Sequence, residues 1–463
     1  MQIKDFLENV CSEIKYKPIR KDISDELELH IQDIKEEYIA SGMNDNEAEE
    51  KAVSNMGDAE EIGKKLNRIH RPKLDWLLLI LVAILIGFGF LIIFIRATRH
   101  QDTYSVNRAI KFVSIGLIAS IVVYFMDYRK SLKCSNLFYI GATLLFILTI
   151  LFGHSINGTH KYIYIPGISF STNNICTYLY IIALAGFLNK FNYEKNIVIN
   201  INQLCLRIKK DTIKIAVLIG ISLILSIPAN GIPMTALLAI SYLILITFHI
   251  VRLEKDVKKN LIKLYSFLAI VGICIIAFVI IGKPRIYSRI ERLISNKIES
   301  EAGYNGWYGE RINETLQNSS FVSNGLGDLD VSYFGLFDGG TCHALITIIA
   351  YYGKICLYLI IFTITALFAK LIINCKNIND NYGKLLIVGF SSIILLQSLV
   401  NILGNLNLIP LMDINLPFIS YGFNGLLVNM VTMAFLLSIY RRKDILYKMD
   451  ETNKKLKIKI YFE

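Results

Sequence analysis

Apolar and polar segments alternate along most of this chain. From Trp76 onward, apolar runs close to the length of about 20 residues that crosses a bilayer as a helix are separated by short polar links. The pattern predicts an all-α, polytopic membrane protein with about ten transmembrane helices. The expected spans are Trp76–Ile95, Ala109–Met126, Leu137–Phe152, Ile175–Leu188, Ile213–Ile227, Met234–Val251, Leu264–Ile281, Ala344–Ile373, Leu385–Ile402 and Leu426–Tyr440.

The first 73 residues have a different pattern and predict a small N-terminal helical domain. Asn44 or Asp45 can cap one of its helices, and Gly57-Asp58 ends that helix and begins the next. Charges occur throughout, and no apolar core of signal-peptide length is present, so we expect this domain to be cytoplasmic. The predicted domains are therefore 1–73, a membrane domain over 74–443 with a large outer loop at 282–343, and a basic cytoplasmic tail at 444–463. An apolar stripe at helical spacing supports the first of them: Ile23, Leu27, Ile31, Ile34 and Tyr38.

Composition and charge agree with a membrane protein. Of the 463 residues, 54% are hydrophobic, and the net charge is +11. Residues 1–73 carry 17 acidic and 12 basic side chains, so the positive excess lies in the membrane part. It concentrates in short connections on the side that ten crossings give to both termini, which is the positive-inside pattern and not a nucleic-acid face. A basic first outer loop is the exception. We expect a multi-pass membrane protein with both termini cytoplasmic, with membrane lipids and no nucleic acid as partners.

The eight cysteines show no CxxC motif and no regular spacing. Most of them lie in or beside apolar segments, where a thiol behaves as a small hydrophobic group. Their spacing supports neither a disulfide framework nor a zinc site, and no metal ligands are assigned.

The last outer segment, Asn401 to Gly425, is the most informative stretch. It contains two prolines and the sequence LPFISYG, which places Ser420 and Tyr421 in irregular backbone at a membrane surface. Such backbone is tolerated there only where it is buried in protein or lines a watery cavity. Taken alone, a connecting loop is the simpler interpretation.

Two further outer connections carry polar motifs, at 153–174 and 282–343. The second includes RIYSRIERLISNKIESE, an apolar stripe flanked by basic residues. Such a helix either lies on the membrane surface or packs on the outer face of the protein.

The order of the motifs resembles that of the SEDS family (FtsW, RodA and SpoVE; shape, elongation, division and sporulation proteins). The motifs are MDYR after the second span, NGTHKYIYIPGISFS from Asn157, the turn Pro228 to Gly231, SNGLG from Ser323 and the final LPFISYG. The resemblance spans Trp76 to about Lys443. The N-terminal domain is similar to the helical prefix domains found before bacterial permease-like proteins, which implies a docking or regulatory module.

The resemblance implies a ten-span enzyme of the bacterial plasma membrane that polymerises lipid II, or a related undecaprenyl-linked precursor, together with a class B penicillin-binding protein. Such a reaction needs a base for the attacking sugar hydroxyl. It also needs cationic groups or a metal for the diphosphate, which leaves the cofactor unknown with a divalent cation as one solution. A groove in the membrane must accept the prenyl tail.

The chain departs from the family at polar positions. Cys342 stands at the position of a family carboxylate, and Ala229 at that of another. Asn174 and Thr177 replace a charged pair. The glycines and serines that follow the final YG in the family are Phe423, Asn424 and Gly425 here.

Asp338, four residues before Cys342, is the candidate catalytic base, although FDGGT also suits an ordinary turn. A Cys342–His343 nucleophile pair is disfavoured, because adjacent helical residues point about 100° apart. The substrate-binding candidates are Asn157, Lys161, Arg285, Arg289, Ser420 and Tyr421, of which the basic ones also suit membrane-interface anchors.

Three functions fit these observations. The first is a SEDS-like peptidoglycan glycosyltransferase that uses Asp338, and the second is a catalytically degenerate SEDS-fold subunit that binds or regulates within a cell-wall complex. The third is a transporter of lipid-linked precursors, against which stands the near absence of charges from the predicted spans.

Overall fold

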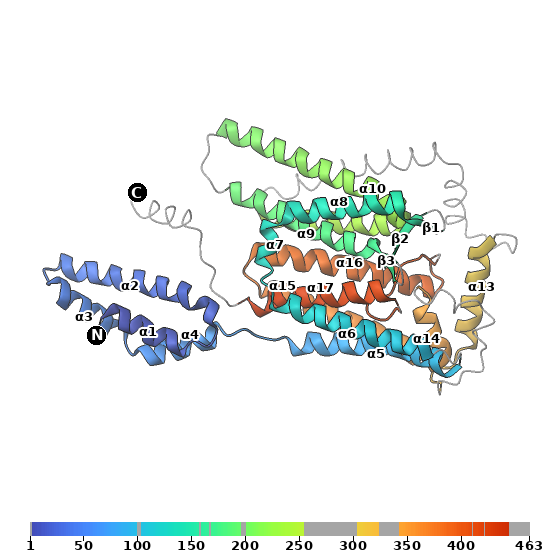
Figure 1. The fold of residues 1–463 in the computed structure, drawn as a ribbon, viewed down its shortest axis with the longest axis horizontal. Helices are drawn as coiled ribbons and strands as arrows, with labels where there is room; N and C mark the ends of the chain where they lie inside the picture. The colour runs from blue at the N-terminus through green and yellow to red at the C-terminus, as the bar shows by residue number, and fades with distance from the viewer. Residues whose placement is uncertain are drawn as a thin grey trace. The chain divides into compact units, whose positions relative to one another are not determined.

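The computed structural model describes residues 2–99, 103–156, 159–165, 168–195, 201–253, 303–323, 342–409, 411–420 and 422–443. The chain divides into two compact units, a small one built by the first 75 residues and a large one formed by residues 76–439 (Figure 1). Each unit has its own hydrophobic core.

The small unit consists of α1 (Ile3–Glu13), the short 3-10 helix η1 (Lys17–Ile19), α2 (Arg20–Ala40), α3 (Asp45–Met56) and α4 (Ala59–Ile69). The helices bury one apolar side, with Phe6, Val10 and Ile31 at its centre. Asn44 caps α3 by accepting a hydrogen bond from the Asn46 amide at 2.9 Å, and Asp58 caps α4 by accepting one from the Glu60 amide at 3.3 Å. The capping expected from the sequence is therefore confirmed, with Asn44 as the first cap.

The large unit is a bundle of apolar helices (Figure 1). Each predicted span except Leu264–Ile281, which lies outside the described residues, coincides with helix, and the helical membrane-protein fold is confirmed. The helices in chain order are α5 (Trp76–Arg99), α6 (Thr103–Phe125), α7 (Arg129–Lys133), α8 (Ser135–Phe152), α9 (Thr172–Lys195), α10 (Ile201–Leu253), α13 (Gly303–Asn318), α14 (Ala344–Tyr352), α15 (Lys354–Lys376), α16 (Asn381–Asn405) and α17 (Phe423–Arg441).

The helical segment α10 is two spans joined by a sharp reversal. Backbone geometry departs from helical at Gly231, which has φ 80° and lies between Pro228 and Pro233. The hydroxyls of Ser222 and Tyr242 lie 3.1 Å apart. In one straight helix these positions would be about 30 Å apart, so the two halves must run antiparallel. The segment α10 therefore contains the separate fifth and sixth spans that the sequence predicted.

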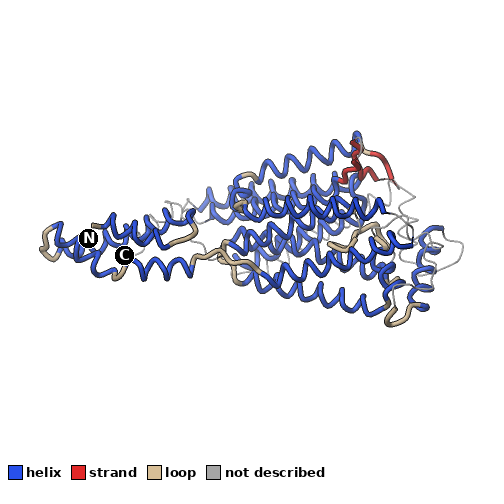
Figure 2. The backbone as a smooth tube through the Cα atoms, turned by 60° about the horizontal axis from the view of Figure 1, so that its bottom comes forward, coloured by secondary structure: helices blue, strands red, loops and turns tan. Residues whose placement is uncertain are grey.

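Two features differ from the sequence prediction. The expected span Ala344–Ile373 is two helices, because Gly353 adopts φ 93° and ends α14 before α15 begins. The outer connection 153–174 contains a small antiparallel sheet, in which β2 (Thr159–Ile165) pairs with β1 (His154–Ile156) on one side and β3 (Ile168–Ser171) on the other. The strands lie at one end of the bundle (Figure 2), and the fold is thus not purely helical.

Candidate functional site

Two buried asparagines near the end of α16 join the segments at this end of the bundle. The Asn401 side-chain amide donates hydrogen bonds to the carbonyls of Ile414, at 2.7 Å, and Cys342, at 3.0 Å. The Asn405 amide donates to the same Cys342 carbonyl at 2.9 Å. Three segments that are distant in sequence are therefore joined at one point: the end of α16, the start of α14 and the loop.

Asn405 also caps α14 from outside that helix. Its side-chain oxygen accepts a hydrogen bond from the Ile346 backbone amide at 3.1 Å. This amide is among the first in α14, which have no partner within the helix. His343, which precedes the helix, makes no capping hydrogen bond with its side chain. Asn405 of α16 therefore caps α14 in place of a residue next to that helix in sequence.

His343 itself lies in a poorly solvated position. Its side chain is buried in the segment before α14, outside the membrane-spanning helices. Burial lowers the pKa of His343 to about 4, and the nearby Asp413 carboxylate opposes this effect only in part. The imidazole is thus neutral at physiological pH.

Ser420 closes a tight turn. Its hydroxyl accepts a hydrogen bond from the Leu416 amide at 2.7 Å, and its own amide donates to the Leu416 carbonyl at 2.9 Å. Within this turn Phe418 has φ 68°, an unfavourable region for a bulky residue. Such strain persists only where surrounding contacts fix the backbone, and it concentrates at functional sites. Ser420, predicted to bind substrate, shapes the loop through its hydroxyl.

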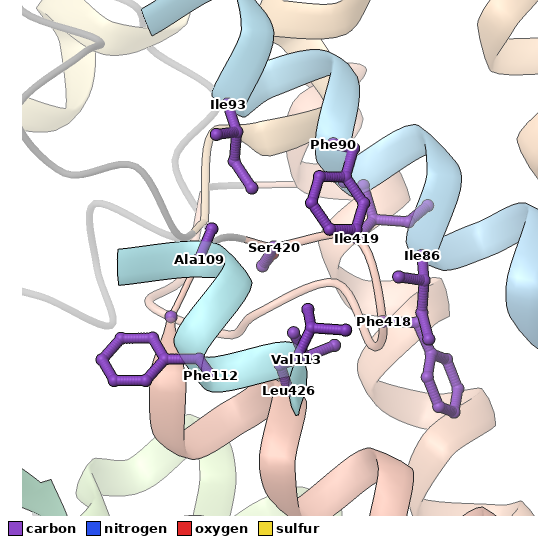
Figure 3. Close-up of a pocket in the computed structure, with 12 residues that line it drawn as sticks. Ile86, Phe90, Ile93, Ala109, Phe112, Val113, Phe418, Ile419, Ser420 and Leu426 are labelled. Carbon is purple, nitrogen blue, oxygen red and sulfur yellow. The ribbon is translucent and has the colours of Figure 1, made fainter. Parts of the chain in front are cut away.

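An apolar groove borders this turn (Figure 3). Its walls are α5, α6, the residues Phe418 to Ser420 and the start of α17. Gly89 of α5 allows the loop to come close, because a Cβ there would lie 2.9 Å from the Ile419 carbonyl oxygen. Ser420 supplies a hydroxyl among side chains that are otherwise hydrocarbon, so the lining of the groove is almost wholly apolar. The lining residues are Ile86, Gly89, Phe90, Ile93, Ala109, Phe112, Val113, Phe418, Ile419, Ser420, Gly422 and Leu426.

The positions that match charged family residues hold neutral groups in a packed environment. Ala229 is fully buried at the reversal in α10. The Thr177 hydroxyl is also buried and donates to the Asn173 carbonyl of its own helix at 2.9 Å. Cys342 contributes its backbone carbonyl to the two asparagines described above. None of these three residues supplies a charge at this end of the bundle.

The other candidates fall largely beyond the described chain. Asp338, Asn157, Arg285, Arg289 and Tyr421 lie outside the described residues. The backbone of Lys161 belongs to β2, and its side chain is not among those described. Within the described ranges, no group of three or more His, Cys, Asp or Glu residues could hold a metal ion. The cofactor therefore stays unassigned.

Comparison with known proteins identifies the family. The family model for FtsW, RodA and SpoVE, described as "Cell cycle protein", matches residues 75–445. The chain belongs to this family. A FtsW of Trichlorobacter lovleyi, named a probable peptidoglycan glycosyltransferase, is 21% identical over 79% of this chain and 92% of its own length. A FtsW of Geobacter metallireducens with the same name is 22% identical over 82% of this chain and 97% of its own.

Solved structures show the same fold for this SEDS chain. A peptidoglycan synthase complex that coordinates polymerization and crosslinking contains a chain that matches with a TM-score of 0.63 and 18% identity, over 81% of this chain and 99% of the other. The rod shape determining protein RodA of Thermus thermophilus matches with a TM-score of 0.52 and 16% identity, over 80% and 97% of the two chains. The membrane unit is thus an integral membrane domain of SEDS type.

Several residues of the site could not be found from the sequence. Asn405 follows the apolar run of α16, and nothing in its spacing indicates that it meets α14. Gly89 gave a weak signal, since a glycine inside an apolar helix is tolerated but costs about 1 kcal/mol relative to alanine. Such a residue commonly marks a close approach of backbone.

Proposed function

We propose that this protein is a SEDS-like peptidoglycan glycosyltransferase, which polymerises lipid II or a related undecaprenyl-linked precursor during cell-wall synthesis. The observation that carries the proposal is the arrangement at the loop end of the bundle. There a strained, asparagine-anchored loop borders an apolar groove, and its Asn415 lies with Asn174 of α9 beside Gly425. A lipid-linked sugar has a polar head group and an apolar prenyl chain, so its binding site needs a polar region beside an apolar one.

The relatives and the resemblance support the finer parts of the proposal. The relatives are named probable peptidoglycan glycosyltransferases, and one structural neighbour belongs to a peptidoglycan synthase complex. A class B penicillin-binding protein is accordingly the partner that we propose. Asp338 would take the proton from the attacking sugar hydroxyl, and Lys161, Arg285 or Arg289 would contact the diphosphate.

We further propose that both termini are cytoplasmic and that residues 1–73 act as a docking or regulatory module there. The distribution of basic side chains supports this orientation. The loop end of the bundle, with the candidate site, would then face outward.

A polymerisation assay tests the main proposal. Purified full-length protein in lipid nanodiscs, alone and with candidate class B penicillin-binding proteins, is supplied with lipid II, and glycan polymer is measured by gel electrophoresis. We expect polymer with at least one partner, and we expect Asp338→Ala to abolish it. Absence of polymer from every pairing would refute the enzymatic proposal.

A second function is favoured by the neutral groups at Ala229, Thr177 and Cys342. Transition-state contacts act together, so the loss of several polar groups is hard to reconcile with unchanged chemistry. The alternative is a subunit that binds the precursor and regulates a cell-wall complex without catalysis. Lipid II binding without polymer would support this alternative, whereas polymerisation abolished by Asp338→Ala would exclude it.

A further inference from the structure

Residues from three segments lie around one small space at Gly425. Asn174 comes from the first turn of α9, Asn415 from the loop, and Gly425 from the first turn of α17. A Cβ on Gly425 would lie 3.4 Å from the Asn415 side-chain nitrogen and 3.7 Å from that of Asn174. Gly425 is buried, and the two asparagines are half-buried. The two amides therefore flank a space of about the size of a methyl group.

The amides of Asn174 and Asn415 have unused hydrogen-bonding capacity. Neither side chain forms a hydrogen bond with another residue in the described part of the chain. This differs from Asn401 and Asn405 a few residues away, whose amides are fully engaged with carbonyls. An asparagine offers two donors and one acceptor. Both side chains are partly exposed, so their hydrogen-bonding partners are water or a ligand. A ligand can supply them here.

The chemistry of the pair selects the kind of ligand. An amide carries no charge and both donates and accepts, which complements a hydroxyl or an acetamido group. A carboxylate, such as the family has at the position of Asn174, only accepts and repels anions. We propose that Asn174 and Asn415 bind a sugar hydroxyl of the lipid-linked precursor, because a hydroxyl is of the size of the space between them. This inference rests on the proposed function and adds the part of the substrate that is recognised.

Gly425 keeps this space open. Phe423, Asn424 and Gly425 stand at the positions of the family's glycines and serines. Of these three, Gly425 has no side chain that could occupy the gap between the amides. A Cβ there would make contacts of ordinary van der Waals length, so Gly425→Ala should fold while filling the space. A loss of binding in Gly425→Ala would therefore result from filling the space and not from unfolding.

The experiment measures binding of two probes to full-length protein in nanodiscs. The probes are lipid II and undecaprenyl diphosphate, which shares the diphosphate and the chain but lacks the sugars. We expect Asn174→Leu, Asn415→Leu and Gly425→Ala each to weaken lipid II binding by about tenfold, with undecaprenyl diphosphate binding unchanged within about twofold. Asn174→Leu added to Gly425→Ala should have little further effect, because the same space is already filled.

Two control variants match the test variants in chemistry. Gly141→Ala introduces a Cβ that meets nothing within 4 Å, and Asn377→Ala removes an exposed asparagine at the end of α15. Both should bind lipid II like the wild type. If the wild type binds lipid II and the three test variants bind it equally well, the amide site is refuted and the proposed function stands. Equal weakening of both probes would refute recognition of the sugar, and no binding of lipid II by the wild type would refute both proposals.

Discussion

Replacing Asn405 by alanine tests whether the asparagine pair fixes the loop end of the bundle. Asn405 is fully buried, and its side-chain oxygen accepts from the Ile346 amide at 3.1 Å. Asn405→Ala leaves that buried donor without a partner, at a cost of about 1–3 kcal/mol. It also removes one of the two donors to the Cys342 carbonyl, although Asn401 still donates there at 3.0 Å. The total expected destabilisation is about 2–4 kcal/mol.

Two measurements test the expected destabilisation, one for the whole protein and one for α14. Equilibrium unfolding in mixed micelles with increasing SDS gives the change in free energy of unfolding. Hydrogen–deuterium exchange of α14 reports the local effect, and the amide of Ile346 should exchange faster in Asn405→Ala. Asn377→Ala, at an exposed position, should change stability by less than about 0.5 kcal/mol. Unchanged exchange in α14 together with a destabilisation below that of the control would show that the cap contributes nothing.

Two further predictions concern the same end of the molecule. Gly89→Ala should destabilise the membrane unit by about 1–3 kcal/mol, because its Cβ would lie 2.9 Å and 3.2 Å from the carbonyl oxygens of Ile419 and Phe418. Gly87→Ala in the same helix meets nothing within 4 Å and should be neutral or stabilising in the same unfolding assay. Because the pKa of His343 is lowered to about 4, the folded state binds fewer protons than the unfolded state below about pH 6.5. Stability should fall as the pH falls from there toward 4, and a His343→Gln variant should show a shallower slope; identical slopes would contradict the burial of a neutral imidazole.

The sequence predicted the spans well because an apolar run of about 20 residues is long enough to cross a bilayer as a helix. The reversal at Gly231 was also foreseeable, since Pro228 and Pro233 flank the glycine. The break at Gly353 was not, because one glycine in an apolar run signals either close packing or a helix end. Its φ of 93° shows that the second applies here.

The candidate site was less predictable than the fold. Periodicity tells which face of a helix is buried, but it does not tell which buried polar groups meet. Asn405 reaches a backbone amide 59 residues away, and Asn415 meets Gly425 through the shape of a strained turn. The motif around Ser420 indicated a loop of fixed shape, and the hydrogen bonds within that loop show why the shape is fixed.

The replacement of several charged family groups by neutral ones follows a physical constraint. Removing one partner of a buried ion pair leaves an uncompensated charge and costs about 3–5 kcal/mol, whereas replacing both partners is often neutral. The resemblance implies a charged pair at the positions of Asn174 and Thr177, and Thr177 is fully buried. Restoring a carboxylate at Asn174 alone would thus create an unpaired charge in a half-buried position. A charged pair at these positions would therefore require both residues at once, which agrees with the proposal that Asn174 acts as a neutral amide.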